Sequence, residues 1–131
     1  MRYLGIDYGT KRIGIAVSDD DGRMAFPAGI IENQGNDTAP KEVAKRMVKE
    51  NIGFVVVGLP VGLDGKETEQ SRITRSFIDG LKKLTTVHVE TQNEMLTSRM
   101  AKAAGMQDEH IDASSAAIIL QSYLDKRNSK P

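Results

Sequence analysis

Bulky apolar residues alternate with small or polar ones near the start of the chain, which is the pattern of β-strands. Residues 3–7 and 13–17 both show this alternation, and the Gly-Thr-Lys sequence at 9–11 is typical of a tight turn between them. The chain is therefore predicted to begin with a β-hairpin. Asp7 ends its first strand, on a face whose other residues are mostly glycine and alanine.

The rest of the chain alternates between strand and helix patterns. A third strand is predicted at 24–31, after an acidic run at 19–22 that we interpret as a solvated hairpin loop. The later elements expected are a helix over 38–52, a buried strand at 54–59, a helix over 73–84, a strand at 86–91, a short helix over 96–105 and a last helix from near Asp112 to Leu124. This order predicts an α/β fold in which antiparallel strands come first and parallel strands with right-handed crossovers follow.

Length and composition narrow the class of protein. The 131 residues suit a single domain over 1–131, with a frayed end from about residue 126. No apolar stretch approaches the roughly 20 residues of a membrane helix, and the start lacks a signal-peptide pattern, so we expect a cytoplasmic protein without membrane contact. Cysteine is absent and the two histidines are far apart. A metal would therefore be held by carboxylates, which favours Mg²⁺ or Mn²⁺.

The charge balance bears on the partner. Lys plus Arg and Asp plus Glu number 18 each, so the chain lacks the basic excess of many nucleic-acid-binding proteins. This counts against nucleic acid without excluding it, because folding can gather basic residues into a local patch.

Asp7 is the first candidate for chemistry. A carboxylate at the end of a strand, among glycine and alanine, has room beside it for a metal ion or a phosphate group. The alternative is that Asp7 is only a turn residue before Gly9, where Asp is common. Lys11 and Arg12 follow in the same turn and could contact a phosphate, although Arg12 could equally pair with a surface acid.

Several motifs in a fixed order make the chain resemble a known family. Residues 4–16 (LGIDYGTKRIGIA), 57–60 (VGLP) with 64–65 (DG), and 111–113 (IDA) with 116–121 (AAIILQ) resemble the YqgF (RuvX) family, which carries the names Holliday junction resolvase and pre-16S rRNA nuclease. The resemblance covers essentially the whole chain. It implies a ribonuclease H-like α/β fold: a five-stranded mixed sheet of three antiparallel and then two parallel strands, with helices on both faces.

The resemblance also implies metal-dependent hydrolysis of phosphodiester bonds in structured nucleic acid, either a DNA junction or pre-16S rRNA. Two divalent ions roughly 4 Å apart can activate water, neutralise the phosphate and stabilise the leaving oxygen. The carboxylates expected to bind Mg²⁺ or Mn²⁺ and to act in catalysis are Asp7, Glu94 and Asp112. The residues expected to contact nucleic acid are Lys11, Arg12, Arg72 and Arg99.

The second acid departs from the family pattern. Family members typically have Asp-Glu-Arg followed by Leu and two hydroxyl residues, whereas residues 93–98 here read NEMLTS. If the family's ligand stands at position 93, the neutral amide of Asn93 weakens the metal site. If it is Glu94, the site is intact. Met95 also replaces an arginine, which removes a rigid bidentate contact to phosphate or carboxylate.

Structural and functional alternatives stay open. Asp112 could be only the N-cap of the last helix, and Glu94 only a first-turn acid after an Asn93 cap. A protein that binds nucleic acid or a ribosome precursor but cleaves poorly would also explain Asn93 and Met95. Residues 7–10 further resemble the phosphate loop of sugar kinases and actin-like ATPases, which bind the nucleotide between two domains. The sequence does not decide whether a homodimer forms.

Overall fold

The computed structural model describes residues 1–35, 37–62, 64–94 and 108–129. Its centre is a five-stranded mixed sheet with the strand order β3-β2-β1-β4-β5. The strands are β1 (Arg2–Tyr8), β2 (Arg12–Ser18), β3 (Ala25–Glu32), β4 (Ile52–Pro60) and β5 (His88–Glu94). β2 pairs antiparallel with both β1 and β3, whereas β4 pairs parallel with β1 and with β5. The predicted mixed sheet, with antiparallel strands first and parallel strands after, is confirmed.

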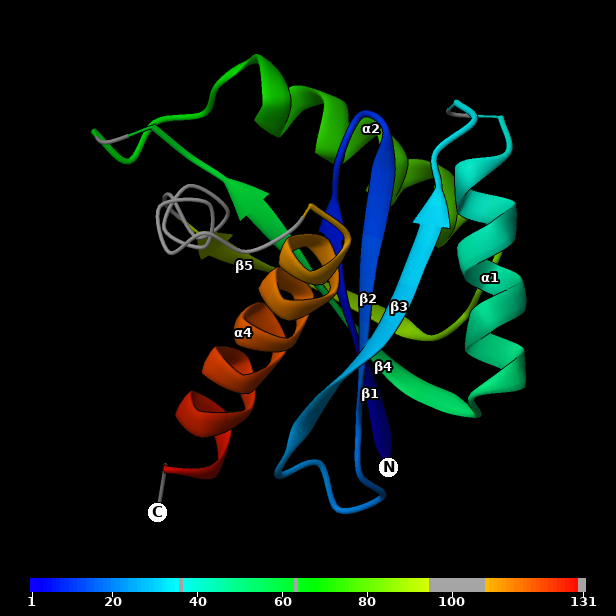
Figure 1. The fold of residues 1–131 in the computed structure, drawn as a ribbon, viewed down its shortest axis with the longest axis vertical. Coiled ribbons are helices and arrows are strands. Elements are labelled where there is room, and N and C mark those ends of the chain that lie inside the picture. The colour runs from blue at the N-terminus through cyan, green and yellow to red at the C-terminus, as the bar shows by residue number, and fades with distance from the viewer. Residues whose placement is uncertain (36, 63, 95–107, 130–131) are drawn as a thin grey trace.

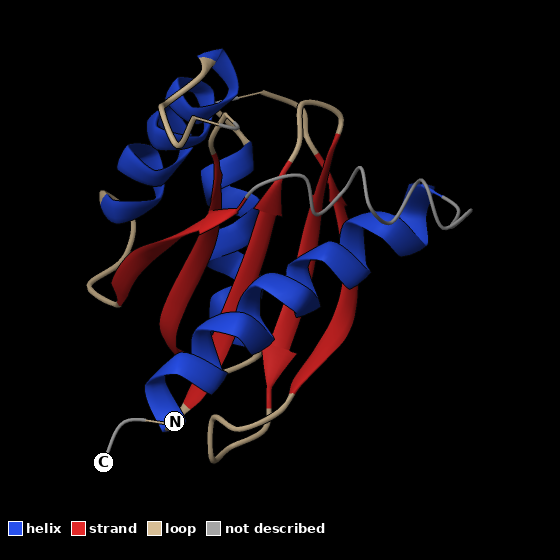
Figure 2. Ribbon diagram, turned by 90° about the vertical axis from the view of Figure 1, so that its left-hand side faces the viewer, coloured by secondary structure: helices blue, strands red, loops and turns tan. Residues whose placement is uncertain are grey.

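Helices cover both faces of the sheet. They are α1 (Ala39–Lys49), α2 (Glu69–Lys82) and α4 (Asp108–Asn128). Of the described helices, α4 crosses one face of the sheet, while α1 and α2 lie on the opposite face (Figures 1 and 2). Within the described ranges, no helix is long and apolar enough to cross a membrane.

Strand alternation divides the buried residues into two cores. Ile6, Ile13 and Val57 pack against α1 and α2 together with Phe77. The alternate strand residues face α4 on the other side of the sheet. The core on that side includes Tyr3, Ala16 and Val56 of the strands with Ile119 and Leu120 of α4. Each strand residue can thus be assigned to a face by its parity.

Some element boundaries differ from those predicted. β5 extends to Glu94 instead of ending at residue 91, because β4 offers backbone partners as far as Pro60. Ile52, predicted to close the helix, instead begins β4. α4 starts at Asp108 and continues to Asn128, into the segment expected to fray. The short helix expected over 96–105 lies outside the described residues.

β3 forms one edge of the sheet and is irregular. Its pairing with β2 shifts register between Ile15 and Ala16, and Pro27 lies within the strand. The guanidinium of Arg46 on α1 donates a hydrogen bond to the carbonyl oxygen of Ala28. The edge is therefore interrupted by a bulge, by a residue without an N–H group and by a bound arginine.

Candidate active site at the carboxyl ends of the central strands

Asp7 lies one residue before the end of β1 and is half-buried. Its flanking residues, Ile6 and Tyr8, face the core under α1 and α2, where the Tyr8 ring stacks on Phe77 with 4.5 Å between the ring centroids. Because successive residues of a strand point to opposite faces, Asp7 faces the α4 side. Its partner in β2 is Gly14, which has no side chain to fill the space beside the carboxylate.

The turn after Asp7 is held by a residue beyond β3. The backbone N–H of Gly9 donates to the carbonyl of Arg12 over 3.0 Å, which closes the turn. The side-chain amide of Asn33 donates to the carbonyl of Gly9 over 2.8 Å, and the backbone N–H of Asn33 donates to the carbonyl of Lys11 over 2.9 Å. Lys11 is exposed and Arg12 is half-buried at this turn, next to Asp7.

The start of α2 lies at the same end of the sheet. Thr68 and Ser71 form a reciprocal capping box, and the Ser71 hydroxyl also donates to the carbonyl of Pro60 at the end of β4. Gln70 donates its side-chain amide to the carbonyl of Tyr8 over 3.4 Å. Arg72, two residues after Gln70, is exposed. The structure thus brings Arg72, Lys11 and Arg12 to the end of the sheet that carries Asp7, whereas Arg99 lies outside the described residues.

β5 also finishes at the end of the sheet that carries Asp7. Gln92 pairs with Gly58, and Glu94 pairs with Pro60. The buried Gln92 donates its side-chain amide to Ser122 of α4 over 2.9 Å, so even-numbered positions of β5 face α4. Position 94 is therefore on the α4 side of the strand, whereas the exposed Asn93 is on the opposite side. The structural alternative, in which Glu94 is only a first-turn helical acid after an Asn93 cap, is wrong, because both residues belong to a strand.

α4 runs antiparallel to β1 and packs closely against it. A Cβ atom added at Gly5 would lie 2.6 Å from Leu120 Cβ and 2.9 Å from the Ala116 carbonyl oxygen. Further along, the guanidinium of Arg127 lies 5.3 Å from the centre of the Tyr3 ring. Residue numbers therefore increase along α4 in the direction in which they decrease along β1.

This register gives the level of position 112. It precedes Ala116 by one helical turn, about 6 Å, and Asp7 follows Gly5 by two strand residues, roughly 6.6 Å. By this spacing, the backbone at position 112 is expected near the level of Asp7 along the sheet. Asp112 is also inside α4 and not at its N-cap, because the helix begins at Asp108. The N-cap alternative is wrong.

The side chains of Glu94 and Asp112 are outside the described part of the structure. Among the side chains that are described, no group of three or more His, Cys, Asp or Glu residues is arranged to hold a metal ion. Asn33, Gln70 and Gln92 contribute contacts that the sequence did not predict. Each is a polar residue in a loop, a first helical turn or a strand, and no local pattern distinguishes it from a solvated one.

Comparisons with known proteins identify the family of the chain. The RuvX family, described as Holliday junction resolvase, matches residues 1–126. A protein of Maridesulfovibrio salexigens named "Putative pre-16S rRNA nuclease" is 36% identical over 95% of this chain and 98% of its own length. Among solved structures, T. thermophilus RuvC in complex with Holliday junction substrate has a TM-score of 0.61 at 14% identity, over 98% of this chain and 96% of RuvC.

A second fold relative bears on the kinase alternative. The ROK hexokinase from Thermus thermophilus has a TM-score of 0.50 at 17% identity, but this chain spans only 39% of the hexokinase. That likeness shows a shared fold alone. The family match and the nearly full-length relative confirm the resemblance drawn from the motifs, and the chain belongs to the RuvX family of nucleases.

Proposed function

We propose that this chain is a metal-dependent nuclease whose carboxylates Asp7, Glu94 and Asp112 bind Mg²⁺ or Mn²⁺. The observation that carries the proposal is the backbone register, which brings the ends of β1 and β5 and an early turn of α4 to one end of the sheet. Strand parity supports Glu94 as the second ligand, because position 94 shares the α4 side with Asp7.

The proposed donor set fits a hard divalent cation. All three residues offer carboxylate oxygens, which Mg²⁺ and Mn²⁺ prefer. Gly14, the β2 partner of Asp7, has no side chain beside the carboxylate, whereas the space over Gly5 and Gly58 is filled by α4. Bound metal would lower the pKa of the attacking water and neutralise charge on the phosphate.

The chain's own residues would position the substrate. Lys11 and Arg12 follow Asp7 in a turn held by Asn33, and Arg72 is exposed at the start of α2. These three cations, with Arg99, are proposed to contact phosphates on either side of the cleaved bond. Their charges are local, which is compatible with a chain of zero formal net charge.

Structured RNA is the proposed substrate class, in the processing of pre-16S rRNA. The relative that carries this name is 36% identical over nearly its full length, whereas RuvC, at 14% identity, supports the fold alone. A substrate of this kind would place the protein in the cytoplasm. A protein that binds RNA and cleaves it poorly is the second candidate, favoured by Asn93 and Met95 in the altered motif.

A cleavage assay separates the two candidates. Purified protein is incubated with a pre-16S rRNA fragment and with a four-way DNA junction, in Mg²⁺, in Mn²⁺ and in EDTA. Metal-dependent cleavage that Asp7→Asn abolishes, with an unchanged circular dichroism spectrum, is the expected result. Binding without cleavage in every metal would establish the second candidate, and undiminished cleavage by Asp7→Asn would remove Asp7 from the mechanism.

A further inference from the structure

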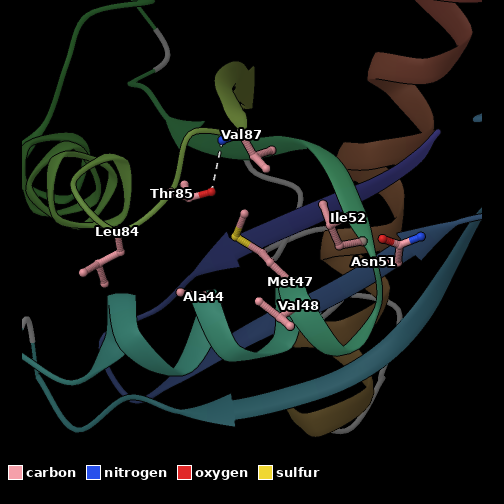
Figure 3. A pocket seen from close by; sticks show the side chains of 8 residues that line it. All are labelled: Ala44, Met47, Val48, Asn51, Ile52, Leu84, Thr85 and Val87. Atoms are coloured by element: carbon pink, nitrogen blue, oxygen red, sulfur yellow. Dashed lines mark hydrogen bonds between the residues drawn. The ribbon is translucent and has the colours of Figure 1, made fainter.

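A hollow of about 330 Å³ lies between α1 and the connection from α2 to β5. Its lining is mostly apolar, with these side chains: Ala44, Met47, Val48, Ile52, Leu84 and Val87. Figure 3 shows the α1 side chains on one side and Leu84 and Val87 on the other. The Thr85 hydroxyl accepts a hydrogen bond from the backbone N–H of Val87 over 3.1 Å, which fixes the connection locally (Figure 3).

The hollow is remote from the proposed nuclease site. Ile52 begins β4, and Val87 immediately precedes β5. Asp7 and Glu94 instead lie at the carboxyl ends of parallel strands, so the length of the sheet separates the two places. The hollow is therefore a second feature of the surface and needs a separate explanation.

Two apolar side chains at its rim contribute little to the core. Val48 is 85% exposed and Leu84 is 47% exposed. On α1 the buried positions include Val43 and Met47, and Val48 lies beside this stripe and not within it. Exposed apolar side chains that surround a hollow are typical of a binding surface.

Lysines surround the apolar part. Lys41 and Lys83 line an adjoining hollow on the other side of Leu84, and Lys82 and Lys83 line a third with Thr85. α1 adds Lys45 and Lys49, which follow Lys41 at intervals of four residues and are exposed. Asp37 and Glu42 lie among these lysines, and Glu42 pairs with Lys45 over 3.4 Å. Asp79 shares a neighbouring hollow with Lys82, and Glu50, next to Asn51, pairs with Arg2. The local charge is thus positive, in a chain whose formal net charge is zero.

We call the hollow lined by Ala44, Met47, Val48, Leu84 and Val87, together with its lysine rim, the groove. We propose that this groove docks an amphipathic acidic segment of a partner protein. Apolar side chains of the segment would enter the hollow, and its carboxylates would face Lys41, Lys83 and their neighbours. A nucleic-acid backbone would use the lysines but leave the apolar hollow unfilled. A second copy across a two-fold axis would place lysine against lysine, which charge repulsion opposes.

The test uses labelled 18-residue helical peptides as probes. One has Leu at positions spaced three and four apart with Glu elsewhere, a second has Lys in place of Glu, and a third has Ala in place of Leu. Fluorescence anisotropy measures binding, and amide chemical shifts locate it. Val48→Asp is compared with Ile118→Asp, because Ile118 is a 51% exposed apolar residue on α4, on the other face of the sheet.

The parent protein is expected to bind the Leu/Glu peptide. The affinity for this peptide should fall at least tenfold in Val48→Asp and in the double variant Lys41→Glu with Lys83→Glu. It should be unchanged in Ile118→Asp. Salt should weaken binding, and cleavage by Val48→Asp should equal that of the parent. The proposal is overturned if the Lys peptide binds equally, if the Leu/Glu peptide does not bind, or if Val48→Asp has no effect. If the parent self-associates and Val48→Asp does not, the groove binds a second copy instead. If Val48→Asp loses binding to anionic vesicles or to duplex RNA, the groove binds a membrane or RNA instead.

Discussion

The side-chain amide of Asn33 donates a hydrogen bond to the carbonyl oxygen of Gly9 over 2.8 Å. This bond joins the end of β3 to the turn that directly follows Asp7. Asn33→Ala should lower the free energy of unfolding by about 1 to 2 kcal/mol, because it also removes the bond that the Gly35 N–H donates to Asn33 Oδ1 over 3.0 Å. Cleavage should fall roughly tenfold, because small displacements of catalytic groups are costly. Urea denaturation and initial cleavage rates measure the two effects.

A matched control for this change exists at the other end of the sheet. Asn128 donates its side-chain amide to the carbonyl of Gly22 over 3.0 Å, the same kind of bond. Asn128→Ala removes this bond, so it should lower the free energy of unfolding by about 1 kcal/mol and leave cleavage unchanged. Equal losses of cleavage in both variants would mean that Asn33 acts through general stability and not through the turn.

Close packing of α4 gives a second prediction. A Cβ at Gly5 would meet the Ala116 carbonyl oxygen at 2.9 Å, and backbone cannot rotate away. Gly5→Ala should therefore lower the free energy of unfolding by about 1 to 3 kcal/mol. It should also reduce cleavage, because α4 must move away from β1 and takes position 112 with it. Thermal unfolding and cleavage rates are measured together.

Gly58 supplies the comparison for Gly5. A Cβ there would lie 2.4 Å from Ile119 Cδ1, the flexible end of a side chain. Gly58→Ala should therefore cost less than Gly5→Ala, and adding Ile119→Val should restore part of the loss. If Ile119→Val gives no recovery, the overlap at Gly58 is not relieved by side-chain truncation.

Strand parity predicts which residue of the altered motif binds metal. Glu94→Gln should reduce cleavage at least a hundredfold and weaken Mn²⁺ binding by calorimetry, because an amide lacks the ligand charge. Asn93→Asp should change both by less than about threefold, since position 93 faces away from Asp7. A strong gain of cleavage in Asn93→Asp would reverse this assignment and make Asn93 the cause of a weakened site.

The turn cations should determine part of the salt dependence of binding. Each phosphate neutralised contributes roughly 0.7 to 0.9 to the slope of log affinity against log salt. Lys11→Ala with Arg12→Ala should therefore reduce the slope by about one to two. Lys126→Ala serves as the control, because Lys126 is exposed in the last turn of α4, at the other end of the sheet. An unchanged slope in the double variant would exclude these two residues as phosphate contacts.

Tyr123 predicts a loss of stability at high pH. Burial, together with its hydrogen bond to Glu90 Oε2 over 2.7 Å, raises the pKa of Tyr123 to about 12 from 10.0. The folded state thus favours the neutral phenol, so its contribution is complete below pH 10 and is lost as the pH rises towards 12. The difference in melting temperature between the parent and Tyr123→Phe should shrink over this range. A difference that stays constant from pH 9 to 12 would contradict the shift.

Much of this architecture could be predicted from local sequence. The alternation around 9–11 and the apolar run of β4 gave the hairpin and the central strand, because strand period and burial determine those patterns directly. The end of β5 could not be predicted this way, since Gln92, Asn93 and Glu94 are polar and are strand residues only because β4 provides partners. Tertiary pairing overrides propensity there.

The candidate site shows the same division. Asp7 could be singled out because its strand and turn are local features of the chain. The levels of positions 94 and 112 depend on the length of β5 and on the contact of α4 with Gly5, both of which join distant segments. Asn33 is separated from Gly9 by the whole of β2 and β3, and no spacing rule connects them.

The irregular edge of β3 has a consequence for behaviour in concentrated solution. An uninterrupted edge strand is a template on which another chain can extend the sheet, and this is a common first step of aggregation. On β3, Pro27 offers no N–H group, the bulge breaks the repeat, and Arg46 already occupies the carbonyl of Ala28. An incoming strand would find few aligned hydrogen-bonding groups, so this side of the sheet resists growth into fibrils while the protein is folded.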